Sequence, residues 1–259
     1  KLKKTFNAHT INEKVALNGV NLRLEDEDFV TVIGGNGAGK STILNALAGV
    51  WPIDEGKIVV DGIDVTPMSE HKRAALFGRV FQDPMTGTAA NMQIEENLAL
   101  ALRRGQKRGL KIGITRAERE MYREKLSTLG LGLENRMTAK VGLLSGGQRQ
   151  ALTLLMATIA KPKLLLLDEH TAALDPGAAE KILAMTTRIA AEQKLTCLMV
   201  THNMRAALAL GNRTLMMNNG QIVLDVSGAE RAHMEVNDLL ERFKSGTGAA
   251  LDNDRILLS

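Results

Sequence analysis

Gly34-Gly-Asn-Gly-Ala-Gly-Lys-Ser-Thr42 follows a short β-branched run, Phe29–Ile33, and precedes a stretch of helical spacing that ends near Gly49. From Gly34 to Ser41 the segment has the spacing G-x-x-x-x-G-K-S, which is typical of a loop that binds phosphate. Glycines allow several backbone N–H groups to converge on one point, and the following helix aims the positive end of its dipole there. The segment predicts a buried strand, a phosphate-binding loop and a helix, in that order.

Two side chains of this loop suit a nucleotide. Lys40 would bring a mobile positive charge to the β- and γ-phosphates, and the Ser41 hydroxyl would bind Mg²⁺. The backbone that would hold the phosphates belongs to Gly34, Gly35, Asn36, Gly37, Ala38, Gly39, Lys40, Ser41 and Thr42. By itself the pattern leaves NTPases of several kinds and kinases open, and a glycine-rich turn with a chance lysine is the plain structural alternative.

Strand-like and helical segments alternate outward from this loop, which predicts an α/β protein with a largely parallel sheet. Strands are expected at 14–24, 29–34, 55–61, 79–81, 164–167 and 197–200. Helices are expected at 40–49, from 115 onward, at 148–160, 175–194 and 228–245, with a helix-rich insertion over about 92–160. Thr115-Arg-Ala-Glu118 has capping-box spacing, and Asn218-Asn-Gly220 predicts a hairpin. Because ligands of parallel sheets bind at the carboxyl ends of the strands, functional residues should follow strands.

Composition places the chain among ordinary globular proteins, since 44% of its 259 residues are hydrophobic and 24% are charged. With only 3% aromatics, the core must be aliphatic, with methionine filling gaps. The single cysteine, Cys197, excludes an internal disulfide and predicts a buried side chain in a strand, in a reducing cytoplasmic location by default.

The net charge and the hydropathy pattern limit the kinds of partner that the chain can have. The net charge of +4 permits contact with anionic lipid or nucleic acid without requiring either. No apolar stretch reaches the roughly 18 residues of a membrane-spanning helix, and Lys1–Thr5 lacks the apolar segment of a signal peptide. A soluble or peripheral protein is therefore expected.

Five further segments follow predicted strands or open predicted helices. They are Gln82 after Arg79-Val-Phe81, Leu144-Ser-Gly-Gly-Gln148, Leu164-Leu-Leu-Leu-Asp-Glu169, Ala172-Ala-Leu-Asp175 and Val200-Thr-His202. In kind and in order they resemble the Q-loop, signature, Walker B strand with its glutamate, D-loop and switch histidine of the ABC (ATP-binding cassette) family. The resemblance covers about residues 1–226, and 227–259 are expected to form a C-terminal helical extension.

This resemblance implies a P-loop NTPase fold with a RecA-like, mostly parallel core, a small antiparallel β subdomain and an inserted α-helical subdomain at about 92–160. It also implies a pair of ATPase subunits that sandwich two ATP molecules with Mg²⁺. Transmembrane permease subunits would be the main partners, with an extracytoplasmic solute-binding protein in the case of an importer. The chain would then lie at the cytoplasmic face of the cell membrane as a peripheral subunit, and no nucleic acid is expected.

The resemblance also assigns roles to individual residues. Glu169 would be the general base or the residue that positions water, His202 would contact the γ-phosphate, and Lys40 and Gln82 complete the expected catalytic group. Mg²⁺ would be held by Ser41, Gln82 and Asp168. The partner subunit's nucleotide would be reached by Ser145, Gly146, Gly147, Gln148 and Asp175. Phe6 is the candidate for stacking on adenine, with a place in the core as the alternative.

The signature segment predicts a second phosphate site on physical grounds as well. Ser145-Gly-Gly147 stands where the helix of 148–160 should begin, and a helix N-terminus with serine and glycine can hold an anion. One chain with two such cradles but one loop lysine suggests that the second serves a partner subunit. The alternative, in which Ser145 merely caps the helix, leaves the two following glycines unexplained.

Two segments depart from the family pattern. His170 stands where proline is usual, beside Glu169, and Glu25-Asp-Glu-Asp28 replaces a turn that usually contains glycine. Neither change touches a reacting group, although His170 is close enough to Glu169 to alter pH dependence.

Two surface segments have open interpretations. A basic run is either a solvated loop or a face held near anionic lipid; it consists of Arg103, Arg104, Lys107, Arg108 and Lys111. The segment 83–96 lies where the family docks its membrane subunit, and its apolar residues Met85, Met92 and Ile94 belong either to that contact or to the core.

The expected function is an ATPase subunit that powers transport of a small organic solute such as an amino acid. Import is favoured over export because the cassette is a free-standing chain. A soluble ABC ATPase acting on the ribosome or on DNA is the alternative, disfavoured by the single cassette and the absence of a heptad run. A regulatory protein that binds ATP without cleaving it is disfavoured by Lys40, Glu169 and His202.

Overall fold

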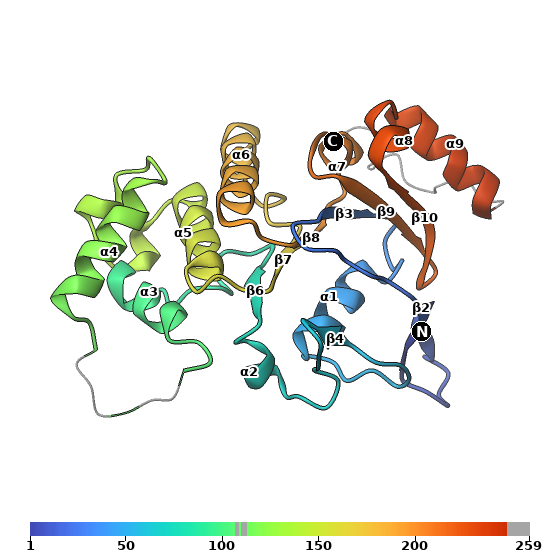
Figure 1. The fold of residues 1–259 in the computed structure, drawn as a ribbon, viewed down its shortest axis with the longest axis horizontal. Helices are drawn as coiled ribbons and strands as arrows, with labels where there is room; N and C mark the ends of the chain where they lie inside the picture. Colours follow the sequence, from blue (N-terminus) through green and yellow to red (C-terminus); the bar gives the residue numbers. More distant parts are fainter. Residues whose placement is uncertain (107–108, 110–112, 248–259) are drawn as a thin grey trace. The chain divides into compact units, whose positions relative to one another are not determined.

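The structure is a computed structural model that describes residues 1–106, 109 and 113–247 (Figure 1). The chain forms two compact units. The first consists of residues 1–73 together with the chain from 194 onward, and the second consists of residues 74–193.

The first unit is built around a buried parallel sheet. Its central strand β3 (Phe29–Ile33) is buried at every residue and runs parallel to β8 (Cys197–Val200) on one side and to β9 (Arg213–Asn218) on the other. β10 (Gln221–Ser227) returns antiparallel to β9 through a turn in which Asn219 and Gly220 both have positive φ. The strands predicted at 29–34 and 197–200 and the predicted hairpin are confirmed.

Two small antiparallel sheets belong to the same unit. β1 (Leu2–Phe6) pairs with β2 (Lys14–Val20), and β4 (Val59–Val60) pairs with β5 (Ile63–Asp64). The strand predicted at 14–24 is therefore shorter than expected, and the prediction of a strand over 55–61 is wrong for most of its length. Gly56 (φ 104°) and Asp61 (φ 51°) have left-handed backbone, which interrupts the extended conformation on both sides of β4.

Helices cover both faces of the sheet of this unit (Figure 1). On one face lies α1 (Lys40–Ala48), and on the other lie α7 (Met204–Ala209), α8 (Gly228–Ala232) and α9 (Val236–Thr247). The short helix α2 (Glu70–Arg73) ends in Arg73, whose guanidinium donates to the carbonyl oxygens of Ala46 and Leu47 at the end of α1. The helix predicted over 228–245 is thus two helices, and residues 248–259 lie outside the described residues.

The core of the first unit is aliphatic and rich in methionine, as the composition predicted. One cluster joins β3, β9, α7 and α9 through Ile33, Met204, Ala207, Met216, Leu239 and Phe243. Cys197 is fully buried in β8, and burial raises the pKa of its thiol to about 12. The thiol is therefore protonated and unreactive, which confirms its prediction as a small core residue.

The second unit combines two parallel strands with a group of helices. Its strands are β6 (Phe77–Val80) and β7 (Leu164–Asp168). Its helices are α3 (Ile94–Leu102), α4 (Arg116–Ser127), α5 (Gly146–Thr158) and α6 (Pro176–Gln193), with 3₁₀ turns η1 (Leu133–Asn135) and η2 (Val141–Leu143). The predicted capping box of Thr115 and Glu118 is confirmed at the start of α4. This unit is longer than the predicted helical insertion at 92–160, whose extent stays a prediction.

The structure describes contacts for parts of the two surface segments whose roles the sequence left undecided, the basic run that begins at Arg103 and the segment 83–96. Arg103 pairs with Glu118 at 2.8 Å, and Arg104 donates to the carbonyl oxygens of Met156 and Ala157, so neither is simply solvated. The basic residues Lys107, Arg108 and Lys111 lie outside the described residues. Of the apolar residues in 83–96, Ile94 is fully buried, whereas Met85 is 48% exposed. Ile94 is therefore a core residue.

Candidate functional site

The loop between β3 and α1 passes so close to two neighbouring strands that only glycine fits at two positions. A Cβ atom on Gly34 (φ 149°) would lie 2.3 Å from the carbonyl oxygen of Met217, and one on Gly39 (φ 103°) would lie 2.5 Å from that of Ala16. The tip of the β9–β10 hairpin adds a hydrogen bond from Gly220 N–H to the Ala38 carbonyl oxygen at 3.0 Å. The loop therefore packs against β2, β9 and the turn that follows β9.

The start of α1 and the side chain of Lys40 give this loop its positive character. Among the described residues, no side chain caps the first turn of α1, so its N–H groups suit an anionic ligand. Lys40 is 5% exposed, and its ammonium donates to the carbonyl oxygens of Gly34 at 2.7 Å and Gly35 at 3.1 Å. The loop thus combines a helix N-terminus with a cation held over it.

A second cation, which sequence reasoning missed, lies beside the same loop. Lys14 opens β2, and its Nζ atom would be 3.2 Å from a Cβ atom built on Gly37. Its side chain is exposed, and no described residue forms an ion pair with it. Nothing in the sequence marks this lysine, because it reaches the loop only through the approach of β2 to the turn after β9, where the Asn18 N–H donates to the Gly220 carbonyl oxygen at 2.8 Å.

His202 reaches the same edge of the sheet from the neighbouring strand. Val32 of β3 is paired with Val200 of β8, and the Thr201 N–H donates to the Val32 carbonyl oxygen at 3.1 Å. The chain therefore leaves β8 at His202 just where it leaves β3 for the phosphate loop. Asn203 then caps α7 through a hydrogen bond from the Ala206 N–H at 2.8 Å, which fixes the backbone after His202.

The predicted adenine-stacking residue packs against a second aromatic ring. Phe6 and Trp51 meet edge to face, with ring centroids 4.9 Å apart and planes at 82°, and Lys4 Nζ lies 5.5 Å from the Phe6 ring centroid. The contact with Trp51 agrees in part with the alternative expectation, in which Phe6 is a packed residue of the core. Stacking of Phe6 on a base stays a prediction.

In the second unit, the predicted Q-loop and Walker B residues leave adjacent strands. Val80 of β6 is paired with Leu167 of β7, so Gln82 and Glu169 each follow the paired position by two residues. Asp168 Oδ2 lies 3.5 Å from Arg79 Nη2. Glu169 has φ 46°, a left-handed conformation that costs a residue other than glycine about 1–3 kcal/mol and often marks a functional site.

The signature segment begins α5 as predicted, through a capping box. The Gln148 N–H donates to Ser145 Oγ at 3.3 Å, and the Ser145 N–H donates to Gln148 Oε1 at 3.2 Å. A Cβ atom on Gly146 would meet Leu174 at 3.5 Å, and one on Gly147 would meet Ala178 at 3.4 Å, both ordinary contacts. Packing among the described residues therefore does not require these glycines, although glycine favours a helix less than alanine does.

Asp175 and His170 anchor the segment between β7 and α6. Asp175 caps α6 by accepting the Ala178 N–H at 3.0 Å. His170 is 2% exposed, and its Nε2 atom lies 3.0 Å from Thr186 Oγ1 of α6. Burial lowers the pKa of His170 to about 4, so the ring is neutral at physiological pH. The histidine that replaces the usual proline thus serves as an uncharged anchor next to Glu169.

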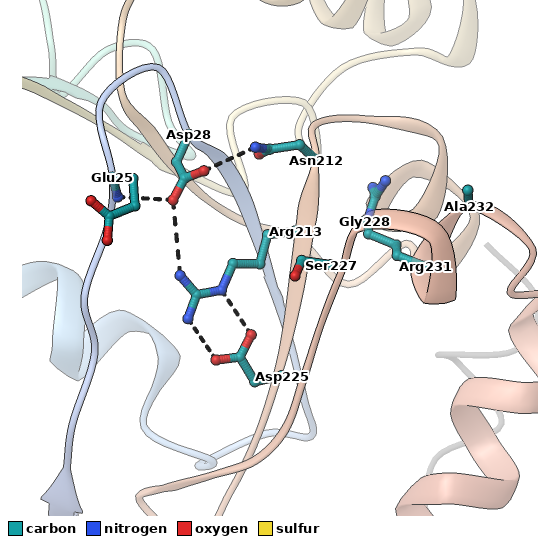
Figure 2. A pocket seen from close by; sticks show the side chains of 9 residues that line it. All are labelled: Glu25, Asp28, Asn212, Arg213, Asp225, Ser227, Gly228, Arg231 and Ala232. Carbon is teal, nitrogen blue, oxygen red and sulfur yellow. Dashed lines mark hydrogen bonds and ion pairs between the residues drawn. The ribbon is translucent and has the colours of Figure 1, made fainter.

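The first unit has a cavity of about 700 Å³, and the side chains that line it are drawn in Figure 2. It is found at the amino ends of β3 and β9, whereas the loop follows the carboxyl end of β3. Arg213 forms a two-bond ion pair with Asp225 at 2.7 and 2.6 Å, and Asp28 accepts the Glu25 N–H at 2.9 Å. The acidic turn that departs from the family pattern is therefore part of a structural network.

A glycine-shaped loop between a buried parallel strand and a helix defines the class of P-loop NTPases. The family model described as ABC transporter matches residues 17–172. A tyrosine transport ATP-binding protein of Clostridioides difficile is 43% identical over 225 residues, which are 87% of this chain and 89% of that protein. A methionine import ATP-binding protein of Rhizobium johnstonii is 35% identical over 211 residues, which are 80% of this chain and 56% of that protein.

Solved structures agree with these relatives. A dimeric ATP-binding cassette in a post-hydrolysis state with ADP and phosphate has a TM-score of 0.74 and 28% identity, and the match covers 87% of this chain and 96% of that one. The chain belongs to the ABC transporter family. It is an ATP-binding, ATP-hydrolysing subunit of a transporter, which confirms the predicted family, fold class and ATPase activity. Among the described residues, no helix has the length and apolar character needed to span a bilayer.

The lowered pKa of His170 predicts a pH dependence of stability. The folded protein binds a proton at this ring only near pH 4, whereas the unfolded chain binds one near pH 6.5. Its stabilising contribution is therefore complete above about pH 6.5 and is lost as the pH falls towards 4. We expect His170→Leu to remove about 2 kcal/mol of the drop in unfolding free energy between pH 7 and 5, measured by urea denaturation.

The control for this measurement is His71→Gln, because His71 is exposed. That variant should keep the pH dependence of the unmodified protein. An unchanged pH dependence in His170→Leu would contradict the assignment of a buried neutral ring.

Proposed function

We propose that this chain is the ATPase subunit of an importer for a small organic solute, with an amino acid as the leading candidate. The 43% identity over 87% of the chain to a tyrosine transport ATP-binding protein carries the proposal, and the methionine import relative supports the direction of transport. Its partners are transmembrane permease subunits, a second ATPase subunit and an extracytoplasmic solute-binding protein. It acts at the cytoplasmic face of the membrane.

In this proposal the phosphates of ATP bind to the backbone of Gly34–Thr42. The cradle that glycine alone permits, the uncapped start of α1 and the ammonium of Lys40 support this assignment. Lys14 adds a second positive charge from β2. Mg²⁺, held by Ser41, Gln82 and Asp168, would supply neutralisation of phosphate charge when bound. Phe6, backed by Trp51, is the candidate to stack on the adenine.

The signature residues Ser145, Gly146, Gly147 and Gln148, together with Asp175, contact the nucleotide of the partner subunit. Two glycines that internal packing does not need, at an exposed helix start, support this role because they keep backbone N–H groups accessible to a phosphate. The two nucleotides then join two copies of the chain, or this chain and a related ATPase subunit.

Hydrolysis needs an attacking water, a group that accepts its proton and groups that stabilise the phosphate charge. A water oxygen attacks the γ-phosphorus, the bond from the γ-phosphorus to the bridging oxygen breaks, and ADP and phosphate result. Glu169 orients the water and accepts its proton, while His202 hydrogen-bonds a γ-phosphate oxygen. The backbone strain at Glu169 supports this role, because such strain is kept where the position of a side chain matters.

Glu169→Gln tests the role of this carboxylate. We expect kcat to fall at least about 100-fold while ATP affinity is retained, because the amide cannot accept the proton of water. The ATP-bound dimer should then accumulate. Phosphate release, nucleotide titration and light scattering measure the three quantities. Glu180→Gln, the same change at an exposed position of α6, is the control. Normal turnover in Glu169→Gln would show that the residue is misassigned.

Lys14→Ala tests the second cation. We expect ATP to bind about 3- to 10-fold more weakly at low salt, with a smaller loss at high salt, because screening weakens an exposed charge. Isothermal titration at two salt concentrations measures this effect. Lys72→Ala, at another exposed lysine, should bind ATP normally, and Lys40→Ala should lose most binding. Equal ATP affinity for Lys14→Ala and the unmodified chain at low salt would contradict the proposal.

Uptake and extraction test the transporter assignment itself. Cells that lack this chain should lose uptake of one amino acid or related solute, and the unmodified chain, but not Glu169→Gln, should restore it. After detergent extraction from its native cells, the chain should co-purify with a polytopic membrane protein. Co-purification with ribosomes or DNA instead of a membrane protein would overturn the assignment.

A further inference from the structure

One buried amide of the signature helix reaches two functional segments at once. Gln150 of α5 is 0% exposed. Its Nε2 atom donates to the His170 carbonyl oxygen at 2.6 Å and to the Phe81 carbonyl oxygen at 3.2 Å. Phe81 directly precedes Gln82, and His170 directly follows Glu169. Since a side-chain amide nitrogen carries two hydrogens, this single group can satisfy both carbonyls.

Neighbouring side chains on α5 hold the amide and the Gln82 segment in place. Thr153 Oγ1 donates to the Gln150 carbonyl oxygen at 2.8 Å and lies 3.4 Å from Gln150 Oε1. The Arg149 guanidinium donates to the sulfur of Met85, and a Cβ atom on Gly87 would lie 3.1 Å from the Thr153 methyl group. The segment from Phe81 to Gly87 therefore lies along the face of α5 that carries Gln150.

The backbone at Glu169 needs such a hold because it is strained. Its φ of 46° is unfavourable for a glutamate, and the strained turn persists only if its surroundings fix it. On its carboxyl side, the His170 ring is anchored on Thr186 and the His170 carbonyl oxygen is anchored on Gln150. Both hydrogen bonds are buried, and loss of the Gln150 donor would leave the His170 carbonyl oxygen without this partner, which is unfavourable away from water.

We propose that Gln150 is a positioning residue for ATP hydrolysis. It ties the backbones beside Gln82 and Glu169 to the helix that begins with Ser145, Gly146 and Gly147. Contact of the N-terminus of this helix with a nucleotide would displace the helix. Because Gln150 holds both backbones, they would then move together with it. The inference rests on the roles proposed above for Gln82, Glu169 and the signature residues.

Gln150→Leu removes both donors while nearly keeping the size of the side chain. We expect kcat to fall about 10- to 100-fold, because small misplacement of a catalytic group has effects of this size. The Kd for ATP should stay within about 2-fold, since the variant leaves the phosphate loop unchanged. Phosphate release and nucleotide titration on the full chain give the two values, and thermal unfolding shows whether the variant is folded.

Thr158→Val is the matched control. Thr158 lies on the same helix, is 0% exposed, and donates to the Leu154 carbonyl oxygen at 2.9 Å within the helix. Its replacement removes a buried hydrogen bond of α5 without touching Phe81 or His170, and kcat should stay near that of the unmodified chain. If Thr158→Val lowers kcat as much as Gln150→Leu, the effect of Gln150 is structural and the inference is overturned.

A double variant separates positioning through Glu169 from general damage. Because part of the effect of Gln150 passes through Glu169, Gln150→Leu should lower kcat by a smaller factor when Glu169→Gln is already present than in the unmodified chain. A fall by the same factor in both backgrounds would overturn the inference. If Gln150→Leu fails to fold, Gln150→Asn replaces it, since its shorter amide cannot reach both carbonyls, and the same split between kcat and Kd is required.

The outcomes also distinguish this inference from the proposed function. Normal turnover in Glu169→Gln would mean that the catalytic assignment fails. Loss of turnover in Glu169→Gln together with an unchanged kcat in a folded Gln150→Leu variant would mean that only the positioning role fails. Parallel loss of ATP affinity and kcat in Gln150→Leu would likewise overturn positioning, because the residue would then act on binding.

Discussion

The close approach of the phosphate loop to its neighbouring strands is the constraint on which the rest of the first unit depends. Gly34 lies against the Met217 carbonyl oxygen and Gly39 lies against that of Ala16, at separations that no Cβ atom could share. The loop can therefore lie this close to β2 and β9 only because both positions are glycine. Because β9 is paired with β3 and β10, the cradle for phosphate is a product of the whole sheet.

The same sheet separates two polar regions of different kinds. The carboxyl ends of β3 and β8 present the phosphate loop and His202, with cations held over the loop. The amino ends of β3 and β9 present Asp28, Arg213 and Asp225, whose charges are paired with one another (Figure 2). Because these three charges are already paired, a charged ligand would add little favourable interaction at the amino ends of the strands. The region at the carboxyl ends is therefore the one suited to binding an anion.

The main constraint in the second unit is the strained backbone of Glu169, which its neighbours must hold in place. Glu169 follows a fully buried run of leucines, and its left-handed backbone must be fixed from the carboxyl side. The neutral ring of His170 and the amide of Gln150 do this without placing a buried charge beside the glutamate. A charged side chain in the same place would be unfavourable, because burial would remove its charge from water. Its charge would also act on the neighbouring carboxylate of Glu169.

The sequence by itself determined the features that depend on neighbours in the chain. These are the strand, loop and helix around Gly34–Thr42, the capping box at Thr115, the helix start at Ser145, the hairpin at Asn218–Gly220, and the family to which the order of the motifs points. The caps and the hairpin are visible in the sequence because hydrogen bonds between nearby residues decide them, whereas the strand and the helix are visible as patterns of apolar residues. The strand predicted over 55–61 forms only at Val59–Val60, because Gly56 and Asp61 have left-handed backbone on both sides of it.

Only the tertiary structure decided which distant side chains meet. It placed Lys14 beside Gly37, Phe6 against Trp51, and Gln150 between the backbones next to Gln82 and Glu169. It also made His170 a neutral core residue, since burial rather than residue type sets that pKa. No local pattern announces these contacts, because each arises from strand pairing and helix packing between segments far apart in the chain.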